Sequence, residues 1–271
     1  MPFHEADVVS ELSRNSVKMN APVPEATESA TVDESSKTAT DLHPAIRVFG
    51  MILAAIAATA VCYTTVAGIG NVYPTPPEVL SLGGRPTEAE RAAASAAQRA
   101  ANTGNAMVWL GVCGAILGGM LSLSNGLLQR AGSKAAISAV AGILAGTGLG
   151  ALAGNLAVSY HASVSTTLIG ATSNAEHQFM MMHGMTWGLI GVGVGLGCGI
   201  SRRPIDAKQV ILMIIVAGAM GGVAGGLYPI IVGVAVPLVN TATPVAPAGV
   251  ARAIWMGLAS LLIAIGVGRA S

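Results

Sequence analysis

The chain has 271 residues, of which 52% are hydrophobic and only 10% are charged, and its formal net charge is +1. Soluble domains carry about 25% charged residues, so this composition excludes an ordinary soluble domain. The small net charge argues against nucleic-acid binding, which requires a concentrated basic surface.

The first 44 residues differ in composition from the rest of the chain. They hold most of the 13 acidic residues, together with many serines, threonines and alanines. The stretch from Glu25 to Asp41 has too little apolar side-chain area to offset the entropy lost on ordering. We therefore predict a disordered tail over residues 1–44.

Long apolar runs fill the remainder, residues 45–271. A helix rises about 1.5 Å per residue, so about 20 apolar residues cross a hydrocarbon core about 30 Å thick. The sequence therefore predicts an all-α integral membrane protein, a bundle of six transmembrane helices. The spans are predicted at about residues 45–68, 107–123, 135–159, 182–200, 209–234 and 251–268.

The connection between the first two spans contains a helix signal of its own. Thr87 and Glu90 have the spacing of a capping box, and an alanine-rich run follows up to Asn102. Gly104 is suited to ending a helix. We predict a short surface helix that lies outside the bilayer and is separate from the second span.

Basic residues gather in the two short connections between spans, which predicts that these connections are cytoplasmic. Arg47 and Arg269 flank the first and last spans on the same side, and the opposite side contains no lysine. Both termini are therefore expected in the cytoplasm of a cell-membrane protein. The basic residues of the short connections are Arg130, Lys134, Arg202, Arg203 and Lys208.

Three spans carry glycine at every fourth residue. Such a row presents a flat face on which a second helix can pack at main-chain distance, as in small-residue motifs of membrane helices. We predict helix packing through these rows, and the pattern is typical of a glycine zipper. The rows are Gly142, Gly146, Gly150 and Gly154 in the third span, Gly191, Gly195 and Gly199 in the fourth, and Gly218, Gly222 and Gly226 in the fifth.

Each of the three tryptophans opens an even-numbered span: Trp109, Trp187 and Trp255. The odd-numbered spans also share short apolar segments, and together these likenesses predict one helical hairpin used three times. The indole rings are expected at the outer membrane interface, where amphipathic aromatic side chains are favoured. Tyr228, near the outer end of the fifth span, is expected there for the same reason.

No acidic or basic residue falls in the middle of a predicted span. Ion-coupled transport and enzymatic catalysis both require ionisable or nucleophilic groups in a defined arrangement. The three cysteines lie in apolar segments without CxxC spacing, which indicates neither a disulfide framework nor a zinc site. The sequence therefore predicts neither enzymatic activity nor a bound cofactor.

One polar cluster at the start of the fourth span has metal-ligating character: His177, Met181, His183 and Met185. Thioether and imidazole groups suit Cu(I), and Met181 and Met185 share one helix face. The alternative interpretation is a flexible apolar helix start with two interfacial histidines.

Two polar residues of the third span, Thr147 and Asn155, are candidates for lining a pore. The alternative interpretation of Asn155 is a hydrogen bond between helices, worth about 0.6 kcal/mol.

These features favour a non-enzymatic membrane scaffold or accessory subunit whose glycine rows bind the bundle together. Its partners are the lipid bilayer and a second copy or another membrane protein, with no nucleic acid. The alternative is a permease or channel for a small uncharged solute or a soft metal ion that enters at the cluster of methionines and histidines.

Overall fold

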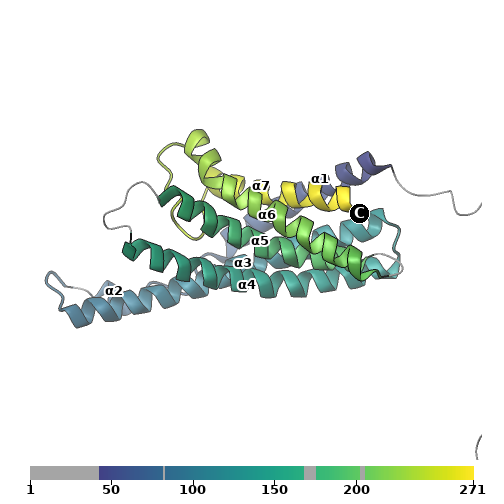
Figure 1. Ribbon diagram of the computed structural model, residues 1–271. Coiled ribbons are helices and arrows are strands. Elements are labelled where there is room, and N and C mark those ends of the chain that lie inside the picture. Colours follow the sequence, from purple (N-terminus) through teal and green to yellow (C-terminus); the bar gives the residue numbers. More distant parts are fainter. Residues whose placement is uncertain (1–42, 82, 168–174, 202–204) are drawn as a thin grey trace, which may run out of the picture. The chain divides into compact units, whose positions relative to one another are not determined.

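A computed structural model describes residues 43–81, 83–167, 175–201 and 205–271. The predicted disordered tail, except for its last two residues, and the basic residues Arg202 and Arg203 lie outside these ranges. The described residues contain helices and no strand. The helices are α1 (Pro44–Ile69), α2 (Pro77–Leu80), α3 (Glu88–Leu128), α4 (Ser133–Thr167), α5 (Ala175–Ile200), α6 (Ala207–Ala235) and α7 (Val250–Ala270) (Figure 1).

Six of these helices are long and apolar enough to cross a membrane. The exception is α2, which is a single turn of 4 residues. The predicted all-α organisation with six long apolar helices is confirmed for the described residues, and it indicates a multi-pass membrane protein. The predicted threefold repeat stays a prediction.

Helix α3 differs from the prediction of two separate helices. It runs without interruption for 41 residues from the capping box at Thr87, so the alanine-rich segment and the second span are one helix. Gly104 does not end it. The aromatic ring of Tyr73 lies so close to Gly104 that a Cβ there would come within 2.6 Å of it. Gly104 therefore lies within a continuous helix, and its missing side chain leaves space for the ring of Tyr73 from the loop after α1.

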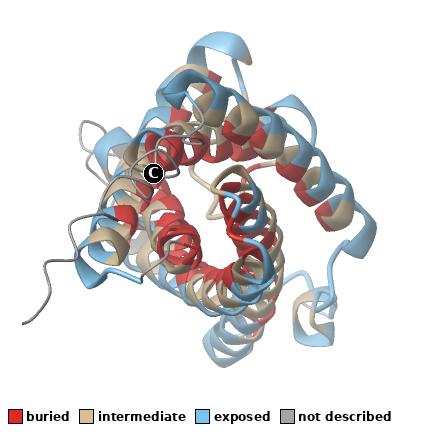
Figure 2. Ribbon diagram, turned by 90° about the vertical axis from the view of Figure 1, so that its right-hand side faces the viewer, coloured by how far each residue is buried: buried red, intermediate tan, exposed pale blue. Residues whose placement is uncertain are grey.

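The long helices pack in the order α1, α3, α4, α5, α6 and α7, and α7 returns to α1. Helices α3 and α5 also contact each other. Half or more of the apolar stretch is buried in α3, α5 and α7 (56%, 50% and 50%), against 22%, 28% and 28% in α1, α4 and α6. Inner helices therefore alternate with outer ones along the chain, and Figure 2 shows the buried residues on the inward faces of the helices.

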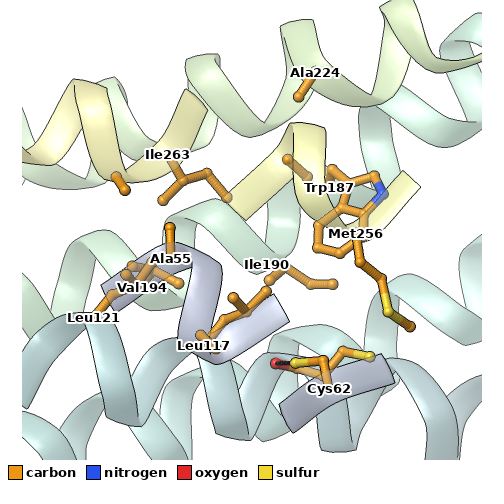
Figure 3. Close-up of a cluster of buried hydrophobic side chains, with 14 of the residues drawn as sticks. Ala55, Cys62, Leu117, Leu121, Trp187, Ile190, Val194, Ala224, Met256 and Ile263 are labelled. Carbon is orange, nitrogen blue, oxygen red and sulfur yellow. Dashed lines mark hydrogen bonds between the residues drawn. The ribbon is translucent and has the colours of Figure 1, made fainter. Parts of the chain in front are cut away.

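The hydrophobic core gathers side chains from five of the six long helices. Figure 3 shows Leu117 of α3, Trp187 and Ile190 of α5, and Met256 of α7 converging with residues of α1 and α6. Among the buried residues that form this cluster, none comes from α4. Helix α4 must therefore be attached by other contacts.

Glycines provide that attachment. A Cβ built on Gly146 would clash with the main-chain oxygen of Gly114, and one on Gly142 would clash with that of Gly118. Further along the same row, Gly150 lies against the oxygen of Leu110. The main chains of α3 and α4 are thus in direct contact, a separation that any larger side chain would prevent.

The same glycine row also contacts α5. A Cβ on Gly193 would lie 3.0 Å from the Cα of Gly146, and one on Gly197 would lie 2.6 Å from the Cα of Gly142. Gly142 and Gly146 are therefore packed between α3 on one side and α5 on the other.

Helices α5 and α6 meet in a similar way, with one correction to the predicted row on α6. On α5, a Cβ on Gly191, Gly195 or Gly199 would be too close to the main chain of α6. On α6, Gly221 and Gly225 are the glycines that lie against the main-chain oxygens of Trp187 and His183. A Cβ on the predicted Gly222 or Gly226 would have its nearest atom at 3.6 or 3.9 Å, which is ordinary contact. A Cβ on Gly218 would lie 3.0 Å from a methyl carbon of the Val192 side chain rather than against main chain. The sequence shows both rows, and helix rotation selects between them.

A small polar network joins three helices at the end of the bundle where α3 turns into α4. The Asn125 amide donates to the Cys198 oxygen at 3.1 Å and to the Ser201 hydroxyl at 3.0 Å. The Ser138 hydroxyl donates to the Gly197 oxygen at 2.6 Å. These side chains satisfy main-chain oxygens in the last turn of α5, where the intrahelical bonding pattern runs out.

The glycine contacts predict a sharp difference between two positions on α4. We expect Gly146→Ala to lower the free energy of unfolding by about 1–3 kcal/mol, because the new methyl group meets rigid main chain. At Gly148 a Cβ would have no atom within 4 Å, so Gly148→Ala should leave stability unchanged or raise it by up to about 1 kcal/mol. Unfolding in mixed detergent–SDS micelles measures both, and equal effects would contradict the packing.

Candidate functional site

The structure does not bring the four predicted metal ligands together. His183 is fully buried, whereas Met181 is 66% exposed and Met185 36% exposed. Residues 181 and 185 share a helix face, and residue 183 lies about 200° away around the axis. His177 is exposed at the start of α5. Among the described residues there is also no group of three or more His, Cys, Asp or Glu side chains that could hold a metal ion.

His183 instead belongs to a buried aromatic cluster, which we define as His183, Trp187, Tyr228 and Trp255. The indole nitrogen of Trp255 donates to Nδ1 of His183 at 3.2 Å. Nε2 of the same ring lies 2.9 Å from the main-chain oxygen of Thr241. Indole is only a donor and a carbonyl only an acceptor, so the hydrogen bonds assign the neutral tautomer with its proton on Nε2. Both ring nitrogens are engaged, which leaves neither available as a metal ligand.

The side chains of Trp187, Trp255 and Tyr228 do not lie on the surface of the bundle. Their predicted place at the membrane interface stays a prediction. All three side chains are buried, with exposed fractions of 0%, 1% and 0%. Their rings pack edge to face, with centroids 5.0 Å apart for Trp187 and Trp255 and 4.8 Å apart for His183 and Tyr228. Such pairs add about 0.5–1.5 kcal/mol beyond the burial of their area. The aromatic rings thus act as core packing.

Two polar atoms of the aromatic cluster have no hydrogen-bond partner among the described residues. They are Nε1 of Trp187 and the hydroxyl oxygen of Tyr228. Trp255 differs from Trp187 in this respect, because its Nε1 donates a hydrogen bond to His183. The two buried tryptophans are otherwise similar.

A pocket of about 600 Å³ lies at the opposite end of the bundle from the turn between α3 and α4. Its walls are the N-terminal part of α3, the C-terminal end of α4, the loop after α1 and the loop before α7. This volume is within the range of small-molecule sites. We call it the outer pocket, and its principal lining residues are Asn71, Tyr73, Gln98, Arg99, Asn102 and Trp109.

One wall of the outer pocket is held to α3 by specific contacts. The Asn105 side chain accepts from the Tyr73 main-chain nitrogen at 2.9 Å and donates to the Tyr73 oxygen at 2.8 Å. The indole nitrogen of Trp109 donates to the Gly70 oxygen at 2.6 Å. Together with the Tyr73 ring against Gly104, these bonds give the loop a defined position.

The charge around the outer pocket is positive. Arg99 is the one formally charged residue in its lining as described, and its guanidinium has no ion pair or hydrogen bond to the described residues. A second cation lies close by, since the Arg252 guanidinium is 5.3 Å from the centre of the Trp109 ring. Trp109 itself is half-buried, and its predicted place at the membrane interface stays a prediction.

The two predicted pore-lining residues differ in exposure. Thr147 is exposed on α4, and its hydroxyl donates to the Ile143 oxygen of its own helix at 2.7 Å. Asn155 is half-buried against α3, with its amide nitrogen 4.0 Å from the sulfur of Met107. Eight residues separate them, which is about 80° around the helix axis, and only Asn155 is partly buried. That they line a pore stays a prediction.

The sequence interpretation missed the outer pocket, because its walls come from four separate segments. A signal was present in the polar residues Gln98, Asn102 and Asn105, which recur at helical spacing just before an apolar span.

Comparison with known proteins adds no assignment: no protein-family model, no curated protein and no solved structure matches this chain.

The aromatic cluster predicts unequal effects of two chemically identical substitutions. Trp255→Phe removes the donor to His183 and leaves a buried acceptor unsatisfied, whereas Trp187→Phe removes a nitrogen that has no partner in the described structure. We expect Trp255→Phe to cost about 1–2 kcal/mol more in unfolding free energy than Trp187→Phe. Detergent–SDS unfolding of both variants tests this, and the reverse order would refute the assigned hydrogen bond.

Proposed function

We propose that this protein is a non-enzymatic membrane scaffold or accessory subunit with a rigid, dry interior. The observation that carries the proposal is the direct main-chain contact of α4 with α3 and of α6 with α5. Helices at this distance leave no room for solute between them. In a bundle so closely packed, the positions of the surface residues relative to one another are fixed. A scaffold protein needs such a fixed surface to bind its partners.

The chemistry of the interior supports the same proposal. His183 is an ionisable side chain at the centre of the aromatic cluster, and both its nitrogens are already bonded. The buried hydroxyls of Ser122 and Ser138 are close to neighbouring helices rather than to a base: Ser122 contacts Cys198 and Ser138 contacts main-chain oxygens. Proton transfer and nucleophilic catalysis require a free base beside an acid or nucleophile. No described group of the interior offers that combination.

The alternative is a path for a soft metal ion or small solute, and its metal part loses support. That part depended on the convergence of His177, Met181, His183 and Met185, and the two methionines face away from the buried His183. We therefore rank it below the scaffold. That the scaffold binds a second copy or another membrane protein stays part of the proposal.

The proposed orientation places both termini in the cytoplasm. Its support is the distribution of cations. Arg47 at the start of α1 donates to the Ser271 main-chain oxygen at 2.8 Å, so the two ends of the described chain lie at one end of the bundle. Gln209 at the start of α6 donates to the Ala270 oxygen at 2.7 Å at the same end. The basic residues beside them match the rule that cytoplasmic loops are rich in lysine and arginine.

A dry interior predicts that the native cysteines resist water-borne reagents. Cys62, Cys113 and Cys198 are buried, with exposed fractions of 1%, 1% and 0%. In intact membranes a charged, membrane-impermeant maleimide should leave all three unlabelled, and SDS should make all three reactive. A cysteine at the exposed position of Ala92 in α3 is the positive control. Rapid labelling of Cys62 or Cys113 in the native protein would place the permeation alternative first.

Orientation has a separate test in a variant in which the three native cysteines are replaced by alanine. With Ala92→Cys as its single cysteine, the protein should react with the impermeant maleimide from outside intact cells. With Ser271→Cys instead, it should react only after the membrane is permeabilised, because residue 271 lies at the cation-rich end. The opposite pattern of labelling would reverse the proposed topology.

A further inference from the structure

We propose that the outer pocket binds a small organic monocarboxylate from the aqueous phase. The carboxylate pairs with Arg99, and the apolar part of the ligand rests against Trp109 and Val158. This binding role is independent of the scaffold proposal, because it concerns the extramembrane end of α3 and α4 and leaves the glycine contacts unaffected.

The charge of the ligand follows from Arg99. Arg99 lines both the outer pocket and a second pocket of about 530 Å³, which is also bordered by α3 and α4. In the described part of the chain it has no hydrogen-bond or ion-pair partner, and no acidic residue lines either pocket there. An arginine presents a planar fork of donors that matches a carboxylate in two parallel hydrogen bonds.

A single negative charge is the best match. Arg99 is the one charged residue in the described lining, and Arg252 adds positive field from a position against the Trp109 ring. Arg252 already has a hydrogen-bond partner, since its Nε donates to the Ala246 oxygen at 3.1 Å. A dianion such as a phosphate monoester would leave one charge without a direct partner.

The remainder of the lining describes an amphipathic ligand. Gln98 donates to the Asn102 side chain at 2.9 Å, which leaves the Gln98 oxygen and the Asn102 amide hydrogens for a ligand. The apolar residues of the lining are Ala106, Trp109, Val158, Ala162, Pro244 and Val245. A body of about drug size, apolar with one or two polar groups, fits a pocket of this volume and composition.

The outer pocket is also formed in advance of binding. The hydrogen bonds between Asn105 and Tyr73 and between Trp109 and Gly70 position the loop after α1. In the loop before α7, the Thr243 hydroxyl donates to the Val245 oxygen at 2.8 Å. Because this wall is already ordered, binding a ligand does not cost the conformational entropy of ordering it, and that cost would otherwise weaken the affinity. The contacts thus distinguish the outer pocket from an accidental gap between loops.

The test is calorimetric titration of the full chain in phosphatidylcholine nanodiscs, which contain no anionic lipid. The probes are 4-phenylbutyrate and its neutral amide, 4-phenylbutyramide, with empty nanodiscs as the blank for partition into lipid. We expect saturable binding of the carboxylate and binding about five- to tenfold weaker for the amide, the range that an arginine–carboxylate pair at a partly exposed site provides.

Two matched variants assign the effect. Arg99→Gln should weaken carboxylate binding about five- to tenfold and leave amide binding unchanged. Arg91→Gln removes the same charge about two turns away on the exposed surface of α3, outside the described lining, and should bind as the unmodified protein does. Absence of saturable carboxylate binding to the unmodified protein, or equal binding by Arg99→Gln, would overturn the proposal without affecting the scaffold.

Discussion

Direct contact between the main chains of α3 and α4 is the constraint on which the rest of the bundle depends. Gly142 and Gly146 face the main-chain oxygens of Gly118 and Gly114, and their other side faces Gly197 and Gly193 of α5. In water such glycines would weaken a helix by about 1 kcal/mol each. In a bilayer every main-chain group must be bonded within its own helix, so the helix persists and the absent side chains become a contact surface.

This close contact determines where large side chains can lie. Since α4 contributes no residue to the described hydrophobic cluster, the bulky groups gather between α1, α3, α5, α6 and α7. Trp187 and Trp255 are buried there, and His183 is bonded both to Trp255 and to the loop before α7. The aromatic cluster thus fills the space that the glycine contacts leave, and it connects α5 to α7 in the half of the bundle nearer the loop before α7.

Helix α3 connects the closely packed interior to the outer pocket. The continuous helix α3 runs from the packed interior to the wall of the outer pocket. Arg99 and Asn102 of the outer pocket therefore lie on the same helix as Gly114 and Gly118 of the interior. The end of α4, held against α3 by its glycine row, forms the neighbouring wall. A site built from rigid helices keeps its geometry better than one built on loops alone.

The sequence alone determined the all-helical class and the number of long apolar helices, because hydrophobic length and composition are local properties of the chain. Tertiary structure alone decided which side chains face inward. It selected Gly221 and Gly225 over Gly222 and Gly226, separated Met181 and Met185 from His183, buried two tryptophans expected at the interface, and joined two predicted helices across Gly104. Each of these outcomes depends on the rotation of one helix against another or on a loop that packs from elsewhere in the chain. No spacing within a single segment specifies that information.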